Sequence, residues 1–196
     1  MFSETVRKYS QKFLEPLARF ISTKNISPNV VTVIGFLLMV VVAIVLAKGY
    51  FVLGGILITV FALFDAIDGM LARMMGRTSR FGAFLDSTLD RFSEAIIFLG
   101  LFIYYIGHDQ RLELILIYAT VVGSLMVSYA RARAEGIGVP LKDGLFTRFE
   151  RIFLLVVGLL FNQMTFVLCL LAIFSNFTAI QRMYMVWRIT GGEEGG

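Results

Sequence analysis

Long apolar segments separated by short polar or glycine-containing breaks run through most of this sequence. The pattern predicts six helical segments, near residues 30–47, 50–75, 81–106, 111–135, 146–161 and 164–187. Most are long enough for the roughly 20 residues that a helix needs to span a bilayer. The fifth is short, and the boundary between the last two is weakly marked because only Asn162 and Gln163 interrupt the apolar run.

The first part of the chain has a different pattern. Its apolar residues recur every three or four positions, and its basic residues lie off that line. Residues 1–26 are therefore predicted to form an amphipathic helix in the membrane interface, with a helix packed on a soluble neighbour as the alternative. Ser27 is expected to cap the next helix, with Pro28 at its first position. Residues 27–190 would form the six-helix domain, and the glycine-rich and glutamate-rich residues 191–196 a disordered tail.

Composition supports an all-α integral membrane protein of one domain. Hydrophobic residues make up 58% of the 196 positions and charged residues only 16%, and the mean hydropathy is +0.80. These values exclude an ordinary soluble domain. The single cysteine, Cys169, excludes a disulfide within the chain. We expect membrane lipids around this protein and no nucleic-acid partner.

The lysines and arginines indicate the orientation. With six spans both termini lie on one side of the membrane, and 16 of the 18 basic residues lie on or nearest to that side. The opposite side has Lys48 and Arg111 alone. Because basic residues accumulate in cytoplasmic loops, the sequence predicts a multi-pass protein of the cell membrane whose termini face the cytoplasm.

Four aspartates in residues 65–90 are the strongest sign of chemistry. Asp65 and Asp68 lie three residues apart on one predicted helix, and Asp86 and Asp90 lie four apart on the next, so each pair shares a helix face. A short connector around residues 76–80 would make the two helices antiparallel neighbours. Counted from that connector, Asp68 and Asp86 both lie about 10 Å deep, and Asp65 and Asp90 both lie about 15 Å deep. The four carboxylates would therefore pair by level across the hairpin. Ionisable residues at such depth indicate a functional site.

Four adjacent carboxylates in a medium of low dielectric constant need protons or cations. Two divalent ions would neutralise them, and the all-oxygen ligand set favours Mg²⁺, with Mn²⁺ as an alternative. Two such ions beside arginines suit chemistry at a phosphoryl centre. Gly69 follows Asp68 directly. A glycine inside a helix costs about 1 kcal/mol relative to alanine, so we expect a ligand to approach the backbone there.

The same residues resemble a known family. Asp65, Asp68, Gly69, Ala72, Arg73, Gly82, Asp86 and Asp90 match in identity and spacing the signature of the CDP-alcohol phosphatidyltransferases. The resemblance implies a six-helix enzyme that transfers a phosphatidyl group from a CDP-linked lipid to an alcohol and releases CMP. It also implies a homodimer, two metal ions per protomer and a cavity that faces the cytosol.

The resemblance further implies a role for each signature residue. Asp65, Asp68, Asp86 and Asp90 would bind the metal ions, and Asp90 would also be the general base for the attacking hydroxyl. The nucleotide would contact Asp65, Asp68, Gly69, Ala72 and Arg73. The residues agree with these roles, because a carboxylate can accept a proton from a hydroxyl about 3 Å away and an arginine can stabilise the charge on departing CMP.

Three later segments resemble the phosphatidylinositol-phosphate synthase branch of the family. They begin at Ser128, Asp143 and Gln181. The resemblance implies a pocket for the phosphate of the acceptor, and its residues would be Ser128, Arg131, Arg151 and Arg182. Cationic side chains suit a phosphate dianion. Without the resemblance, such arginines are more often topology anchors or contacts to lipid headgroups.

The preferred prediction is therefore an enzyme that joins CDP-diacylglycerol, or an ether-lipid analogue, to inositol phosphate. An alternative keeps the enzyme and changes the acceptor to glycerol 3-phosphate, which would give phosphatidylglycerol phosphate. A distant alternative is a divalent-cation transporter. Transport would place acids on more than one helix pair, often with inverted repeats, whereas the acids here lie in one hairpin.

Overall fold

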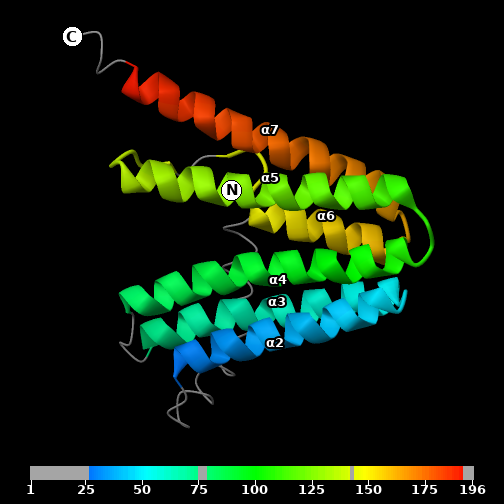
Figure 1. The fold of residues 1–196 in the computed structure, drawn as a ribbon. Helices are drawn as coiled ribbons and strands as arrows, with labels where there is room; N and C mark the ends of the chain where they lie inside the picture. The colour runs from blue at the N-terminus through cyan, green and yellow to red at the C-terminus, as the bar shows by residue number, and fades with distance from the viewer. Residues whose placement is uncertain (1–26, 75–78, 142–143, 192–196) are drawn as a thin grey trace. The chain divides into compact units, whose positions relative to one another are not determined.

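Six helices make up the described part of the chain, and each coincides with a predicted segment. The structure is a computed structural model that describes residues 27–74, 79–141 and 144–191, with the backbone alone for 63–74. The helices are α2 (Pro28–Ala47), α3 (Phe51–Met74), α4 (Arg80–Ile106), α5 (Arg111–Gly136), α6 (Arg148–Leu160) and α7 (Met164–Thr190) (Figure 1). The predicted interfacial helix and all of the predicted tail except Gly191 lie outside the described residues.

The breaks between these helices have local causes. Gly49, Asp109 and Asn162 adopt positive φ angles of 82°, 53° and 53°, a left-handed conformation that ends a helix. Pro28 begins α2 as predicted, but the predicted Ser27 cap is wrong in one respect. The Ser27 side chain makes no capping hydrogen bond, and its backbone oxygen instead accepts from the Val30 N–H at 3.0 Å.

Three of the described helices are long and apolar enough to cross a membrane. They are α2, α5 and α7, and the apolar part of α3, Phe51–Ala62, is shorter. Helix α4 has 27 residues, but acids and arginines interrupt its apolar sequence. The predicted all-helical fold is therefore confirmed for the described residues, three of whose helices could cross a membrane by their length and composition. Six spans stay a prediction.

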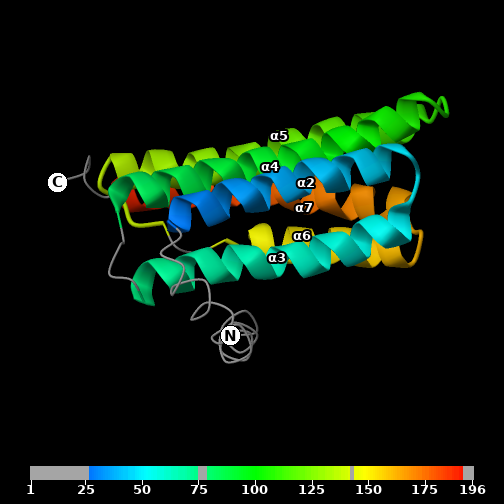
Figure 2. The ribbon, with the colours of Figure 1, turned by 90° about the horizontal axis from the view of Figure 1, so that it is seen from below.

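The described residues up to Leu101 form one compact unit, in which α2 contacts both α3 and α4. A short turn at Gly49 joins α2 to α3 (Figure 2). Gly54 of α3 lies against the Leu46 side chain, and Gly100 of α4 lies against the backbone of Ala43. A side chain at Gly100 would overlap that backbone, so the glycine allows α2 and α4 to approach closely.

The residues from Phe102 onwards form the second compact unit, in which α7 packs against both α5 and α6. Side-chain hydrogen bonds cross the α5–α7 contact. The Thr165 hydroxyl donates to Glu113 Oε1 at 2.7 Å, and Asn176 Nδ2 donates to the Ala119 carbonyl at 2.9 Å. Polar side chains of this kind hold helices together in an apolar medium, so α5 and α7 form a well-defined support for the residues that they carry.

Candidate functional site

The predicted acidic site lies on α3 and α4. Both helices are continuous through the aspartates, and they run in opposite directions (Figure 1). Asp65 and Asp68 belong to α3, as do the predicted nucleotide contacts Gly69, Ala72 and Arg73. The side chains of all five lie outside the described residues. The predicted pairing of carboxylates across the hairpin therefore stays a prediction.

Asp86 and Asp90 lie one turn apart on α4, and both are half-buried. The start of this helix is fixed by Ser79, whose Oγ accepts a hydrogen bond from the Gly82 N–H at 2.9 Å. Such a cap satisfies a backbone donor that the first turn leaves without a helical partner. Glu94 extends the same row by one turn and is only 5% exposed. Sequence analysis overlooked it, although the four-residue spacing from Asp90 was a visible signal.

The part of the chain whose side chains are described contains no cluster of three histidines, cysteines or acids. Two of the four predicted ligands, Asp65 and Asp68, lie outside that part, and the two that it contains, Asp86 and Asp90, are both carboxylates. Carboxylates are hard oxygen ligands of the kind that Mg²⁺ and Mn²⁺ prefer. Asp86 and Asp90 share a helix face and are not fully buried, which is compatible with a divalent ion held in part by a substrate.

A second group of candidate residues lies wholly in the unit from Phe102 onwards. Arg131 of α5, Arg151 of α6 and Arg182 of α7, which we call the cationic cluster, lie close enough for the charges of the first two to act on Arg182, on which Glu135 acts with the opposite charge. Ser128 is half-buried on α5 and lies three residues before Arg131, so the two share a helix face. The structure thus brings together three of the four residues predicted to bind the acceptor's phosphate.

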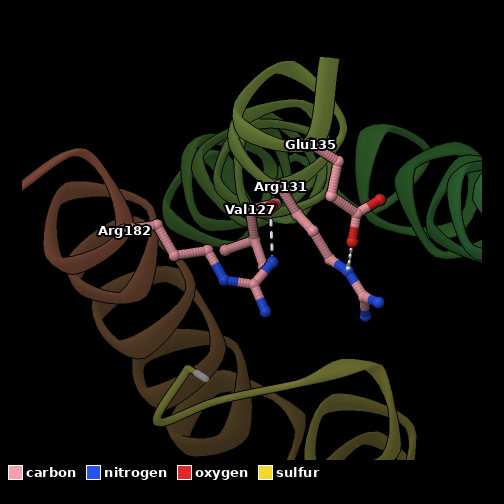
Figure 3. A network of polar contacts seen from close by, with 4 residues as sticks. All are labelled: Val127, Arg131, Glu135 and Arg182. Carbon is pink, nitrogen blue, oxygen red and sulfur yellow. Dashed lines mark hydrogen bonds and ion pairs between the residues drawn. The ribbon is translucent and has the colours of Figure 1, made fainter. Parts of the chain in front are cut away.

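The three arginines of the cationic cluster are held differently. Arg182 is 4% exposed and Arg151 is 3% exposed, and Arg182 Nη1 donates to the Val127 carbonyl at 2.6 Å. Arg131 is exposed, and its Nε donates to Glu135 Oε1 at 2.8 Å. Figure 3 shows the guanidinium groups of Arg131 and Arg182 on the same side of α5. Sequence analysis did not assign Glu135, although its position four residues after Arg131 predicts this ion pair.

Arg151 is positioned by the start of α6. Glu150 Oε2 accepts hydrogen bonds from the Thr147 hydroxyl and from the Thr147 N–H, the latter at 2.8 Å. Arg151 Nη1 donates to the Phe146 carbonyl at 3.4 Å. The first turn of the helix is therefore tied to the segment that precedes it, and Arg151 is fixed in the same turn. The fifth helix begins at Arg148, two residues after the predicted start near Phe146.

Residues 25–188 match the family model described as CDP-alcohol phosphatidyltransferase. An archaetidylinositol phosphate synthase of Pyrococcus horikoshii is 39% identical over 180 residues, which are 91% of this chain and 93% of that protein.

The similar solved structures include two of the phosphatidylinositol phosphate synthase of Mycobacterium tuberculosis. The structure with CDP-DAG bound has a TM-score of 0.83 and 33% identity, and the match covers 88% of this chain and 92% of that one. The structure in complex with manganese and citrate has a TM-score of 0.81 and 34% identity, with coverage of 88% of each chain.

Proposed function

We propose that this chain, which belongs to the CDP-alcohol phosphatidyltransferase family, transfers the phosphatidyl group of CDP-diacylglycerol, or of an ether-lipid analogue, to inositol phosphate. The similar proteins described above are synthases of phosphatidylinositol phosphate or archaetidylinositol phosphate. The chain is accordingly a transferase of phospholipid biosynthesis, with phosphatidylinositol phosphate and CMP as the proposed products.

The cationic cluster is the observation that carries the proposed acceptor. Arg151 and Arg182 are almost fully buried, and burial of a guanidinium away from water is costly. Three like charges that interact also repel one another. A phosphate dianion bound among them would relieve that repulsion and accept charge-assisted hydrogen bonds, which planar guanidinium groups provide in pairs. Ser128 would add a hydroxyl donor to the same phosphate.

Asp90 would act as the general base. It would accept the proton of the attacking acceptor hydroxyl as the oxygen of that hydroxyl forms a bond to the lipid-side phosphorus. The bond from that phosphorus to the bridging oxygen would then break, and CMP would leave with the electron pair. Gly69 and Ala72 would let the nucleotide lie against α3, and Arg73 would stabilise the charge on the leaving group.

Asp65, Asp68, Asp86 and Asp90 would hold two divalent ions, Mg²⁺ or Mn²⁺. Manganese is present in one of the similar solved structures. When bound, such ions polarise phosphoryl oxygens and stabilise the charge that develops on them.

The membrane arrangement is part of the proposal. All six helices would span the cell membrane, residues 1–26 would lie in the interface, and both termini and the acidic site would face the cytoplasm. This side is where a soluble, phosphorylated acceptor would be available. We also propose that the protein is a homodimer.

The proposal is tested by CMP release from CDP-diacylglycerol. Membranes from an expressing strain are incubated with inositol phosphate, glycerol 3-phosphate, serine or free inositol, each with Mg²⁺ or with EDTA. We expect CMP release when inositol phosphate is supplied with Mg²⁺, and no release with EDTA or with the other acceptors. Preference for glycerol 3-phosphate would replace the acceptor, and no release with any acceptor would reject the enzyme activity.

A matched pair of variants tests the acceptor site. Arg151→Ala removes a buried member of the cationic cluster, whereas Arg133→Ala removes an exposed arginine of α5. We expect the KM for inositol phosphate to rise in the first variant and not in the second, with the KM for CDP-diacylglycerol unchanged in both. Equal losses with phosphorylated and unphosphorylated acceptors would contradict the phosphate role of Arg151.

A further inference from the structure

The guanidinium of Arg182 rests on a residue that has no side chain. A Cβ atom placed on Gly144 would lie 2.8 Å from Arg182 Nη2, 2.9 Å from Nε and 3.2 Å from Cζ. The same guanidinium is also held by α5, where the Val127 carbonyl accepts a hydrogen bond from Arg182 Nη1 at 2.6 Å. The guanidinium is therefore confined between α5 and the segment before α6, with no room for a methyl group at position 144.

Backbone conformation does not explain the glycine. The described glycines with positive φ angles are Gly49 and Gly138, and Gly144 is not among them. An alanine could adopt the same backbone conformation. The requirement at position 144 is thus one of space, and the space is taken by the Arg182 side chain.

The neighbouring residue on α7 holds the same segment in place. Gln181 Oε1 accepts a hydrogen bond from the Leu145 N–H at 3.2 Å. Two consecutive side chains of α7 therefore contact two consecutive residues of the segment. This segment continues through Phe146 and Thr147 into the first turn of α6, where Arg151 lies. The seating of the segment on α7 thus sets how Arg151 and Arg182 are placed relative to each other.

We infer that Gly144 and Gln181 are positioning residues for the acceptor's phosphate, a role that rests on the proposed function. Because it has no side chain, Gly144 leaves the space that the Arg182 guanidinium needs to reach the Val127 carbonyl. Gln181 holds the segment that leads to Arg151 against α7. Neither residue contributes a charge. They act through two arginines whose spacing must fit one phosphate group, because bidentate recognition depends on geometry as well as on charge.

Gly144→Ala is the central test, with Gly136→Ala as its control. A Cβ atom at Gly136, the last residue of α5, would meet nothing within 4 Å. At Gly144 the atoms that must yield are the end of a flexible side chain, so the fold should tolerate the change. We expect the KM for inositol phosphate to rise roughly tenfold, as for one lost charge-assisted hydrogen bond. The KM for CDP-diacylglycerol and the melting temperature should stay close to those of Gly136→Ala.

Two further variants separate positioning from a general structural role. Gln181→Met keeps the length of the side chain and removes the acceptor oxygen, and it should raise the same KM by a smaller factor. Arg182→Lys removes the planar group that meets Gly144, so adding Gly144→Ala to it should change kcat/KM for inositol phosphate less than twofold. The inference would be overturned if the losses in kcat/KM of the two single variants multiplied in the double variant. It would also be overturned if Gly144→Ala and Gly136→Ala had the same KM for inositol phosphate. Failure of the wild type to use any phosphorylated acceptor would instead reject the proposed function.

Discussion

Gly123→Ala tests how far the stability of the protein depends on the close contact of α5 and α7. A Cβ atom at position 123 would lie 2.8 Å from Asn176 Nδ2, 2.9 Å from the Asn176 backbone nitrogen and 2.9 Å from Ser175 Cβ. The second and third of these atoms are not at the ends of flexible side chains. The added methyl group can therefore be accommodated only if the two helices move apart.

The expected cost follows from these contacts. Overpacking of a well-packed core costs about 1–3 kcal/mol. The separation would also lengthen the bond from Asn176 Nδ2 to the Ala119 carbonyl, now 2.9 Å, and a side-chain hydrogen bond between membrane helices is worth about 0.6 kcal/mol on average. For a chain of this size each kcal/mol lowers the melting temperature by about 2–4 °C. A decrease of about 3–14 °C is expected.

Thermal unfolding in detergent, followed by the loss of monodisperse protein, measures this change. Gly136→Ala again serves as the control, because its methyl group would meet nothing within 4 Å. Asn176→Ala removes only one of the three obstructing atoms, so it should rescue Gly123→Ala only in part. The reasoning is refuted if Gly123→Ala and Gly136→Ala have the same melting temperature, or if adding Asn176→Ala to Gly123→Ala restores the stability completely.

Three further predictions concern the metal site, Arg131 and the start of α6. EDTA should abolish CMP release, and Mg²⁺ or Mn²⁺ should restore it in the wild type but not in Asp90→Asn; activity that persists in EDTA would contradict the metal site. Glu135 would compete with the acceptor's phosphate for Arg131, in an exposed ion pair worth about 0.3–0.5 kcal/mol. Glu135→Gln should therefore lower the KM for inositol phosphate by up to about twofold, and a rise in that KM would contradict the competition. Glu150→Ala removes the oxygen that accepts both hydrogen bonds from Thr147 and should lower the free energy of unfolding by about 1 kcal/mol, measured by thermal unfolding, whereas Glu150→Gln, which keeps an acceptor oxygen, should cost less.

The helices could be predicted from the sequence because apolar runs and helix breakers are local signals. All six described helices coincide with predicted segments to within three residues at either end. The weakest predicted boundary was near Asn162, where only two polar residues interrupt the apolar run. The structure places Asn162 at a φ of 53°, and asparagine is one of the few residues with a side chain that adopts this conformation readily. Two helices therefore form where composition alone would also allow one.

The contacts within the candidate site could be predicted only in part. The ion pair between Arg131 and Glu135 lies within one helix, and its four-residue spacing was available from the sequence. The bond from Arg182 to the Val127 carbonyl and the contact of Arg182 with Gly144 join residues far apart in the chain. No periodicity specifies such contacts, because they depend on how α5, α6 and α7 pack. The family resemblance suggested the arginines but could not indicate which neighbours position them.

Burial separates two arginines of the cationic cluster, Arg151 and Arg182, from arginines that would anchor the protein in a membrane. An anchor interacts with headgroups and water, so it should stay exposed, as Arg133 and Arg188 do. Arg151 and Arg182 are more than nine-tenths buried, and at such positions an anchor would lose the solvation that makes it useful. Like charges buried near one another repel, and a phosphate bound among the three arginines would reduce that repulsion. The sequence predicts that all of these arginines lie on the same side of the membrane, but only the packing of α5, α6 and α7 distinguishes the two buried residues as candidates for binding a substrate.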